Sequence, residues 1–353
     1  MAALSPMMQQ YFDIKKQHPD KILFFRLGDF YEMFYDDAIL ASKELELTLT
    51  GRDCGQEERA PMCGVPFHSY ENYVARLIAK GYKVAICEQM EDPALAKGLV
   101  KRDIIRVVTP GTVIESSMLQ DDKNNYIASI YITEKKAGVC FADVSTGTAH
   151  ATVLTGEKLG PEIISELCRY SPSEVLFNAA ILDYKEVTAY IKQQLACSVE
   201  LLDEAAFAPD ACMEEMRAQF GDAPEKTAGL APESPAFTAL AVLLGYLKET
   251  QKKGVERLKT VHNYAEAQYM QLSPVTRANL ELTETMRGRE KKGTLLWVLD
   301  KTQTAMGKRL MRAWIEQPLV NVAAINARLD GVEELVGDSV ARADIAAALS
   351  KIF

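Results

Sequence analysis

The stretch that decides how this 353-residue chain begins to fold is Ile22-Leu23-Phe24-Phe25-Arg26-Leu27-Gly28-Asp29-Phe30-Tyr31-Glu32-Met33-Phe34. It opens with a nearly continuous apolar run, and the acidic pair Asp36-Asp37 that follows it is typical of a helix start. We expect a strand over Ile22–Glu32. If the strand continues through Glu32, its period of two places Phe30 and Glu32 on one face and Tyr31 on the other.

Phe30 and Glu32 would form an unusual pair on a solvent-facing surface. A Phe ring pushed into the minor groove partly unstacks a base step and kinks the duplex, and unstacking costs least where a base is already mismatched. A carboxylate near phosphates is repelled unless it hydrogen-bonds a base edge. The pair therefore suits defective duplex DNA. Two structural alternatives stay open: Phe30 is a core residue, or Asp29–Glu32 is a helix capping box.

Five further segments support the DNA interpretation: Ala60–His68, Val84–Gln89, Arg106–Thr112, Thr294–Asp300 and Met306–Leu310. Together with Gly28–Glu32 they resemble, in the same order, motifs of the MutS family of bacterial DNA mismatch repair proteins. The resemblance implies that Gly28–Glu32 is the mismatch-reading motif. In that role Phe30 stacks on a mispaired base and Glu32 hydrogen-bonds it.

Weaker DNA contacts are expected around this motif. Leu27, just before the motif, adds apolar surface beside the Phe30 ring. Arg52 follows the Thr50-Gly51 turn, at a position where members of the family often contact the DNA backbone. Three more basic residues lie on or beside a predicted strand, although a solvated charge cluster is an equal alternative for the first two. These five residues are Leu27, Arg52, Lys101, Arg102 and Arg106.

The fold class that the resemblance implies is multidomain α/β plus α. We expect a mixed α/β mismatch-recognition domain over residues 1–115, a ribonuclease-H-like α/β connector over 116–245 and the beginning of a helical core or lever domain over 246–353. In the first segment, local patterns predict helices at Asp36–Leu47 and Tyr70–Lys80, with Ser69 and Gly81 at the ends of the second helix, and strands at Lys83–Cys87 and Asp103–Val108.

In the second segment the predicted strands are Tyr126–Thr133, Ala137–Asp143, Thr148–Thr155 and Glu174–Phe177, with a helix at Pro161–Arg169. From about Phe237 the pattern is helical. Phe141–Gly147 is similar to the first catalytic strand of ribonuclease H enzymes. A nuclease needs several carboxylates around paired Mg²⁺ ions, and Asp143 supplies only one, so we expect a connector. Near Thr276 the family usually has Asp and Arg where Ser273 and Ala278 stand here.

Charge is distributed unevenly over the three segments. Residues 1–110 carry 14 Lys/Arg against 16 Asp/Glu (net −2), residues 111–245 carry 9 against 20 (net −11), and residues 246–353 carry 17 against 13 (net +4). The middle segment is the least suited to phosphate and better suited to protein contacts. A protein-interaction module that recruits a downstream repair factor through this acidic connector is therefore the alternative function.

Seven cysteines without a Cys-x-x-Cys pair indicate reduced thiols. Cys54, Cys63 and His68 lack the spacing and the fourth ligand of a zinc site, so we expect no metal, and a structural role for His68. No apolar run has the length of a membrane span. We expect a cytoplasmic, nucleoid-associated protein that does not contact a membrane.

No Gly-x4-Gly-Lys-Ser/Thr sequence occurs within residues 1–353. Members of the resembled family hydrolyse ATP through a C-terminal domain that also dimerises. We therefore expect an N-terminal piece that is not itself an enzyme, with no catalytic residues and no cofactor, while ATP and Mg²⁺ are implied for the missing domain. Expected partners are duplex DNA with mismatches or small loops, a repair protein of the MutL type, and a second copy in the full-length homodimer.

Overall fold

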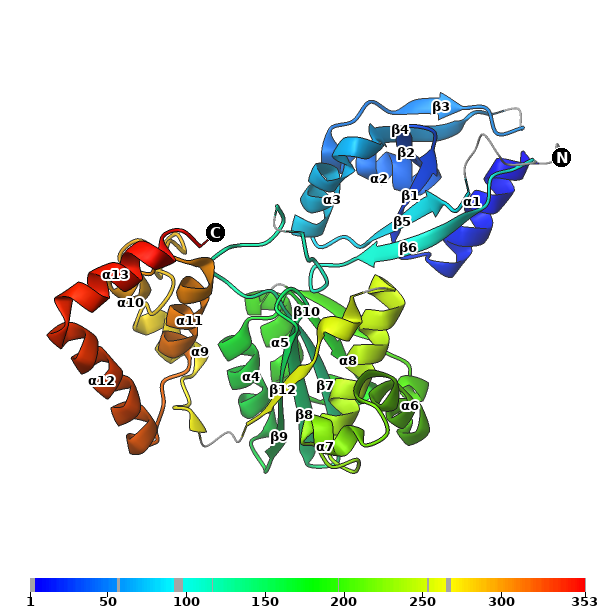
Figure 1. Ribbon diagram of the computed structural model, residues 1–353. Helices are drawn as coiled ribbons and strands as arrows, with labels where there is room; N and C mark the ends of the chain where they lie inside the picture. The colour runs from blue at the N-terminus through cyan, green and yellow to red at the C-terminus, as the bar shows by residue number, and fades with distance from the viewer. Residues whose placement is uncertain are drawn as a thin grey trace. The chain divides into compact units, whose positions relative to one another are not determined.

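The computed structural model describes residues 4–55, 58–91, 98–115, 117–195, 197–252, 254–264 and 268–352. The chain divides into two units. One runs to Val113 and includes Gly245–Glu256, and the other comprises Ile114–Leu244 and Arg257 onward. Each unit contains one six-stranded sheet (Figure 1). In the part of the chain described here, no helix is long and apolar enough to cross a membrane.

The first sheet has the strand order β3-β4-β2-β1-β5-β6. β1 runs parallel to β5, and the other neighbouring pairs are antiparallel. Two of its strands and two of its helices were predicted, with slightly different ends. The elements are α1 (Pro6–Gln17), β1 (Ile22–Leu27), β2 (Phe30–Phe34), α2 (Tyr35–Leu45), β3 (Thr50–Arg52), β4 (Ala60–Pro66), η1 (Phe67–Ser69), α3 (Tyr70–Ala79), β5 (Val84–Gln89) and β6 (Arg102–Val108).

The prediction of one continuous strand over Ile22–Glu32 is wrong. The chain reverses at Gly28-Asp29, and β1 and β2 form a hairpin in which Leu27 pairs with Phe30. Gly28 has φ +57°, the positive value that glycine supplies at the first central position of a two-residue hairpin turn. Continuous apolar residues on both sides of Gly28 had concealed the turn.

Phe30 and Glu32 nevertheless lie on one face of the sheet and Tyr31 on the other, as expected, because all three belong to β2 and side chains alternate along a strand. Phe34 packs with Phe25 and with Tyr11 of α1 in one cluster, and Phe30 and Glu32 share that face. Tyr31 and Met33 are buried on the other face, where Tyr31 lies against Tyr70 of α3. The capping-box alternative is wrong, since Asp29 lies in the turn and Glu32 in a strand.

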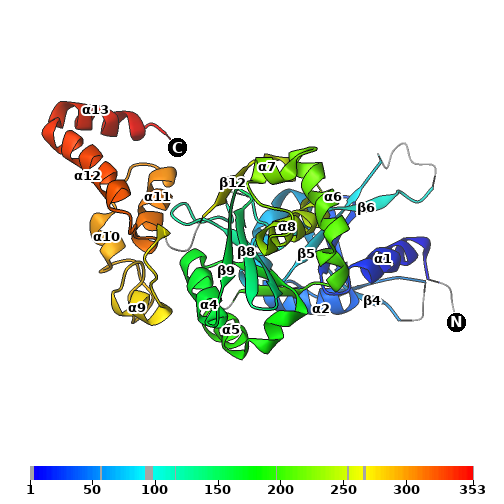
Figure 2. The same ribbon diagram turned by 90° about the horizontal axis from the view of Figure 1, so that it is seen from below.

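The second sheet has the order β11-β10-β7-β8-β9-β12. β7, β8 and β9 form an antiparallel meander, and β10, β11 and β12 add in parallel at its two sides. Helices α4 and α5 cover one face and α6, α7 and α8 the other (Figure 2). The strands are β7 (Tyr126–Thr133), β8 (Lys136–Asp143), β9 (Thr148–Thr155), β10 (Glu174–Phe177), β11 (Ser198–Leu201) and β12 (Thr260–Asn263).

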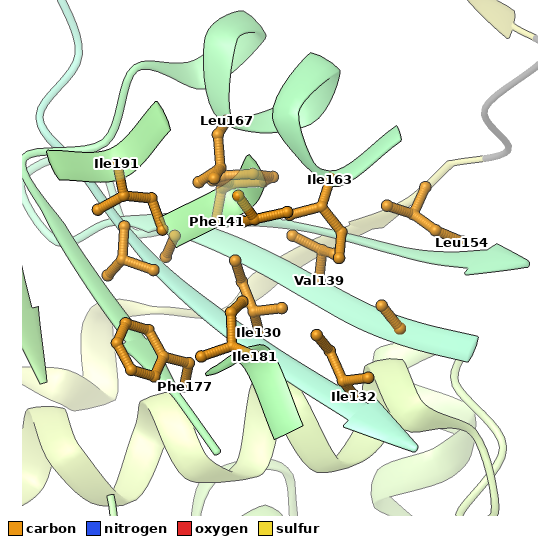
Figure 3. Close-up of a cluster of buried hydrophobic side chains, with 14 of the residues drawn as sticks. Ile130, Ile132, Val139, Phe141, Leu154, Ile163, Leu167, Phe177, Ile181 and Ile191 are labelled. Carbon is orange, nitrogen blue, oxygen red and sulfur yellow. The ribbon is translucent and has the colours of Figure 1, made fainter. Parts of the chain in front are cut away.

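The helices between β9 and β12 in the sequence are α4 (Leu159–Tyr170), η2 (Ala179–Asp183), α5 (Lys185–Tyr190), η3 (Ile191–Leu195), η4 (Glu204–Phe207), α6 (Pro209–Phe220), α7 (Pro224–Ala228), α8 (Pro235–Gln251) and η5 (Val255–Arg257). Figure 3 shows the core on the α4 side, where Val139 and Phe141 of β8 lie beneath Ile163 and Leu167. On the other face, a Cβ at position 138 would lie 1.9 Å from the carbonyl oxygen of Pro235, so only glycine permits this approach of α8.

Beyond β12 the described residues include helices with side-chain N-caps: α9 (Pro274–Asn279), α10 (Leu295–Leu299), α11 (Ala305–Glu316), α12 (Val322–Gly337) and α13 (Ser339–Leu349). The Ser273 hydroxyl accepts the Thr276 N–H at the start of α9, so serine supplies the cap that an Asp would supply there. The helical expectation from Phe237 onward missed β12, which pairs with β9. The domain bounds stay predictions, and residue 116, where the second domain was expected to begin, lies outside the described residues.

Replacing Gly28 tests the turn. The space around its Cα is open, so Gly28→Ala should destabilise the first unit only through its positive φ, by about 1–2 kcal/mol. Gly28→Asn should cost less because Asn tolerates the left-handed conformation. Urea unfolding of both variants provides the measurement. Equal stability of wild type and Gly28→Ala would contradict the turn geometry.

Two histidines lie side by side where β12 joins the second sheet. His150 of β9 and His262 of β12 are register partners, and their rings stack with centroids 5.1 Å apart. Burial, with a smaller contribution from His262, lowers the pKa of His150 to about 4. In the unfolded chain, by contrast, a histidine takes up its proton near pH 6.5.

Acid should therefore weaken this unit. Between about pH 6.5 and pH 4 the unfolded state binds more protons than the folded state, so the free energy of unfolding falls as the pH drops. The contribution of His150 is full above pH 6.5, and its loss amounts to about 3 kcal/mol. His150→Phe keeps a ring without a titrating group and should flatten this dependence in urea melts. An unchanged pH slope in His150→Phe would refute the assignment.

Candidate nucleic-acid interface

The tip of the β1–β2 hairpin presents Phe30 to solvent. Its side chain is 46% exposed, whereas the neighbouring Tyr31 is 3% exposed and Phe25 of the preceding strand is fully buried. Phe30 pairs with Leu27 on one side and with Pro66 of β4 on the other. Leu27 is half-buried and packs against the α1-side cluster. The core alternative for Phe30 is thus wrong, since its ring is not enclosed.

Glu32 lies on the same face, two residues further along β2. Its carboxylate forms an ion pair with the Arg52 guanidinium of β3. Gly64 of β4 lies opposite Glu32, and a Cβ there would come within 3.4 Å of the Glu32 Cγ. The absent side chain at position 64 leaves room for Glu32 to extend across β4. The structure therefore brings together Phe30, Glu32 and Arg52, three of the predicted site residues.

The Arg102 side chain is buried on the same face of the sheet. Its guanidinium lies 5.0 Å from the Phe25 ring centroid and donates to the carbonyl oxygen of Arg26 at 2.8 Å and to Gln10 Oε1 at 2.9 Å. Burial lowers the pKa of Arg102, and the nearby Arg52 lowers it further. Because this side chain is 8% exposed, its contacts are those of a structural residue, and phosphate contact stays a prediction.

Lys101 directly precedes β6, and Arg106 lies within it. Lys101 is exposed, and its backbone N–H donates to Glu91 at 2.7 Å. Arg106 is half-buried and donates to the carbonyl oxygen of Thr112 at 3.2 Å. That carbonyl belongs to the turn Thr109–Thr112, which the buried Thr109 and Thr112 hydroxyls close. Of these two residues, Lys101 has the more accessible side chain.

Sequence reasoning missed a polar group behind the hairpin. The Tyr31 hydroxyl donates to Glu88 of β5, and Arg26 donates to the same carboxylate oxygen at 3.2 Å. Arg26 also lies against the ring of Phe67, 3.8 Å from its centroid. The available signal was that Arg26 and Tyr31 flank Gly28-Asp29 at equal separation, as cross-strand partners in a hairpin do.

The zinc and nuclease alternatives find no support in the geometry. Cys54 packs in the α1-side cluster, whereas the Cys63 thiol donates to the carbonyl oxygen of Ala38 on the opposite face. Burial raises the pKa of Cys63 to about 11. The Asp143 carboxylate is buried and accepts from Asn124, Asn125 and Ser145, and the described residues contain no cluster of three metal-ligating side chains.

Three family models match the chain in succession. The model described as MutS domain I matches residues 5–117, MutS domain II matches residues 125–261, and MutS domain III matches residues 275–353. The β1–β2 hairpin lies within the first match. The second match covers β7 to β11 and ends within β12.

Curated relatives agree with these matches. The DNA mismatch repair protein MutS of Ruminiclostridium cellulolyticum is 50% identical over 353 residues, which is all of this chain and 40% of the relative. The proteins of the same name from Acetivibrio thermocellus and Clostridium tetani are each 48% identical, over 100% and 99% of this chain and 40% and 38% of their own lengths. The chain thus spans about 40% of the length of these relatives, and it belongs to the MutS family.

Proposed function

We propose that this chain recognises mispaired or unpaired bases in duplex DNA and thereby serves the first step of DNA mismatch repair. Phe30 stacks on the mispaired base from the minor groove, and Glu32 accepts a hydrogen bond from its edge. The inserted ring kinks the duplex toward the major groove. Discrimination arises because unstacking a mismatched base costs less than unstacking a paired one.

The observation that carries the proposal is the exposure of Phe30. The exposed part of this aromatic side chain contributes nothing to folding, since apolar surface stabilises a protein only when it is buried. Tyr31 and Met33 of β2 are buried, so the Phe30 ring, beside the ion-paired Glu32, is accessible to DNA. The match of residues 5–117 to MutS domain I and the mismatch-repair names of the relatives support the same assignment.

Arg52 gives Glu32 a counter-charge next to the DNA backbone. In the free protein the pair is closed, and this reduces the repulsion between Glu32 and phosphates. When a base edge engages Glu32, the Arg52 guanidinium can turn to a phosphate oxygen. Lys101 and Arg106 are assigned to the backbone with it, and these contacts position the duplex without reading its sequence.

Residues 1–353 contain no Gly-x4-Gly-Lys-Ser/Thr sequence, and ATP hydrolysis is not part of the function proposed for them. ATP, Mg²⁺ and homodimerisation are attributed to the part of the MutS relatives that lies outside the 40% of their length that this chain spans.

A second candidate function is recruitment of a MutL-type repair protein by the connector. The edge strand β11 exposes Val199 (47%) and Leu201 (53%), and the acidic Asp203 and Glu204 follow it. Exposed edges pair readily with a strand from a partner. Val199→Lys should then weaken binding of a MutL-type protein in a titration with labelled chain while leaving DNA binding unchanged. Unaltered MutL binding would exclude this edge.

Phe30→Ala should abolish the preference for mismatched over matched duplex. One base–aromatic stack contributes about 1–3 kcal/mol, and Tyr31, buried on the opposite face, offers no substitute. Fluorescence anisotropy with duplexes that differ at one base pair measures the preference. The exposed Phe30 should leave the urea melt unchanged, whereas the buried Phe25→Ala should cost about 3–5 kcal/mol. A preference retained in folded Phe30→Ala would refute the proposal.

Glu32→Ala should raise affinity for matched duplex and blunt discrimination. Removing the carboxylate ends its repulsion of phosphates and also releases Arg52 to bind them. Glu32→Gln keeps a base-edge acceptor without the charge, so it should raise matched affinity while retaining more discrimination. The same anisotropy titrations decide the matter. Matched affinity that stays at the wild-type value in both variants would contradict the assigned role of Glu32.

On its own, the chain should bind mismatched duplex with a dissociation constant in the micromolar range or weaker. The first 110 residues have a net charge of −2, and non-specific affinity depends on phosphate neutralisation. A single module also lacks the effective-concentration gain of a second DNA-contacting subunit. A nanomolar constant at physiological salt would show that these residues suffice for tight binding.

A further inference from the structure

Arg26, Phe67 and Glu88 meet behind the Gly28-Asp29 turn. They come from three of the sequence segments quoted above, and the proposed recognition of a base assigns no role to any of them. Arg26 lies on β1, Glu88 on β5, and Phe67 directly after β4. Arg26 is the cross-strand partner of Tyr31, so both side chains lie on the face opposite Phe30 and Glu32. The group supports the turn from its rear.

The Arg26 guanidinium holds the turn directly. Its Nε donates to the carbonyl oxygen of Gly28 at 2.5 Å, and its NH1 donates to Glu88 Oε1 at 3.2 Å. Its flat side covers the Phe67 ring, with the Arg26 Cζ 3.8 Å from the ring centroid. A planar guanidinium makes these three contacts at once, which the single ammonium of lysine cannot do.

Two further hydrogen bonds complete the support. The backbone N–H of Phe67 donates to the carbonyl oxygen of Asp29 at 2.9 Å, so the carbonyls of both turn residues are bound. The Tyr31 hydroxyl donates to the Glu88 carboxylate. Burial and this carboxylate raise the pKa of Tyr31, and the phenol therefore remains a donor at neutral pH.

We propose that Arg26 is a positioning residue which, with Glu88 and Phe67, locks the Gly28-Asp29 turn so that Phe30 is held ready before DNA arrives. This inference rests on the proposed function of Phe30. Holding a contact residue in its bound geometry removes an entropy cost that binding would otherwise bear, and a site needs such support from the residues behind it. The side chain of Arg26 is only 15% exposed, which suits a supporting role better than a phosphate contact.

The test compares Arg26→Gln and Arg26→Lys with a matched control, Arg76→Gln. Arg76 of α3 also donates to a backbone carbonyl, that of Leu45 at 3.1 Å, but away from the turn. Two quantities are measured on the whole chain. One is the ratio of dissociation constants for matched and mismatched duplex, and the other is the hydrogen-exchange rate of the Phe67 amide, which reports closure of the turn.

Arg26→Gln should reduce the mismatch preference about tenfold, the effect expected from losing one charge-assisted hydrogen bond, and should accelerate exchange of the Phe67 amide by a similar factor. Arg26→Lys, which keeps the charge, should recover only part of both. Arg76→Gln should change neither. If Arg26→Gln fails to fold, Arg26→Lys alone decides, with the same direction expected in both measurements.

Equal weakening of matched and mismatched binding, with unchanged Phe67 exchange, would overturn the inference and make Arg26 a phosphate contact. Wild-type values of both quantities would overturn it as well. Phe30→Ala, measured alongside, separates this failure from failure of the proposed function. If Phe30→Ala loses its preference while the Arg26 variants keep theirs, only the positioning role falls. If Phe30→Ala keeps its preference, the assigned reading residue is wrong and the positioning role falls with it.

Discussion

The reversal of the chain at Gly28 is the constraint on which the rest of the site depends. A positive φ of +57° closes a two-residue turn, and the residue that follows the turn stands at the end of the sheet. In a strand that ran straight on, the period of two would place Phe30 on the face opposite Phe25, whereas the hairpin places both on one face, with Phe30 exposed at the start of β2. The turn thus determines the face on which the Phe30 ring lies.

Two ion pairs act on opposite faces of this hairpin. On the face of Phe30, Arg52 balances Glu32, so the carboxylate assigned to the base does not face phosphates as an isolated anion. On the other face, Arg26 and Glu88 tie the turn to β5. Partly exposed pairs contribute little to stability by themselves. Their consequence is geometric. Arg52 fixes the Glu32 side chain, and Arg26, held by Glu88, fixes the carbonyl oxygen of Gly28 in the turn before Phe30.

Much of the fold could be predicted where local signals agreed. β7 and β10 begin and end as expected because apolar strands there are bounded by polar turns. β12 was missed because Thr260–Asn263 is short and polar and is a strand only through its pairing with β9. The buried position of Arg102 was missed for a similar reason, since its partners Gln10 and Phe25 come from distant parts of the sequence.

The most direct test of the central claim is a photo-cross-link between the mispaired base and the protein. A duplex carrying 5-iodouracil at the mismatch would be irradiated with this chain, and the linked residue identified by mass spectrometry. Aromatic rings stacked on the base are the expected partners, so the cross-link should fall on Phe30 and should be lost with a matched duplex. A cross-link of equal yield on matched DNA, or one that falls outside the β1–β2 hairpin, would contradict the assignment.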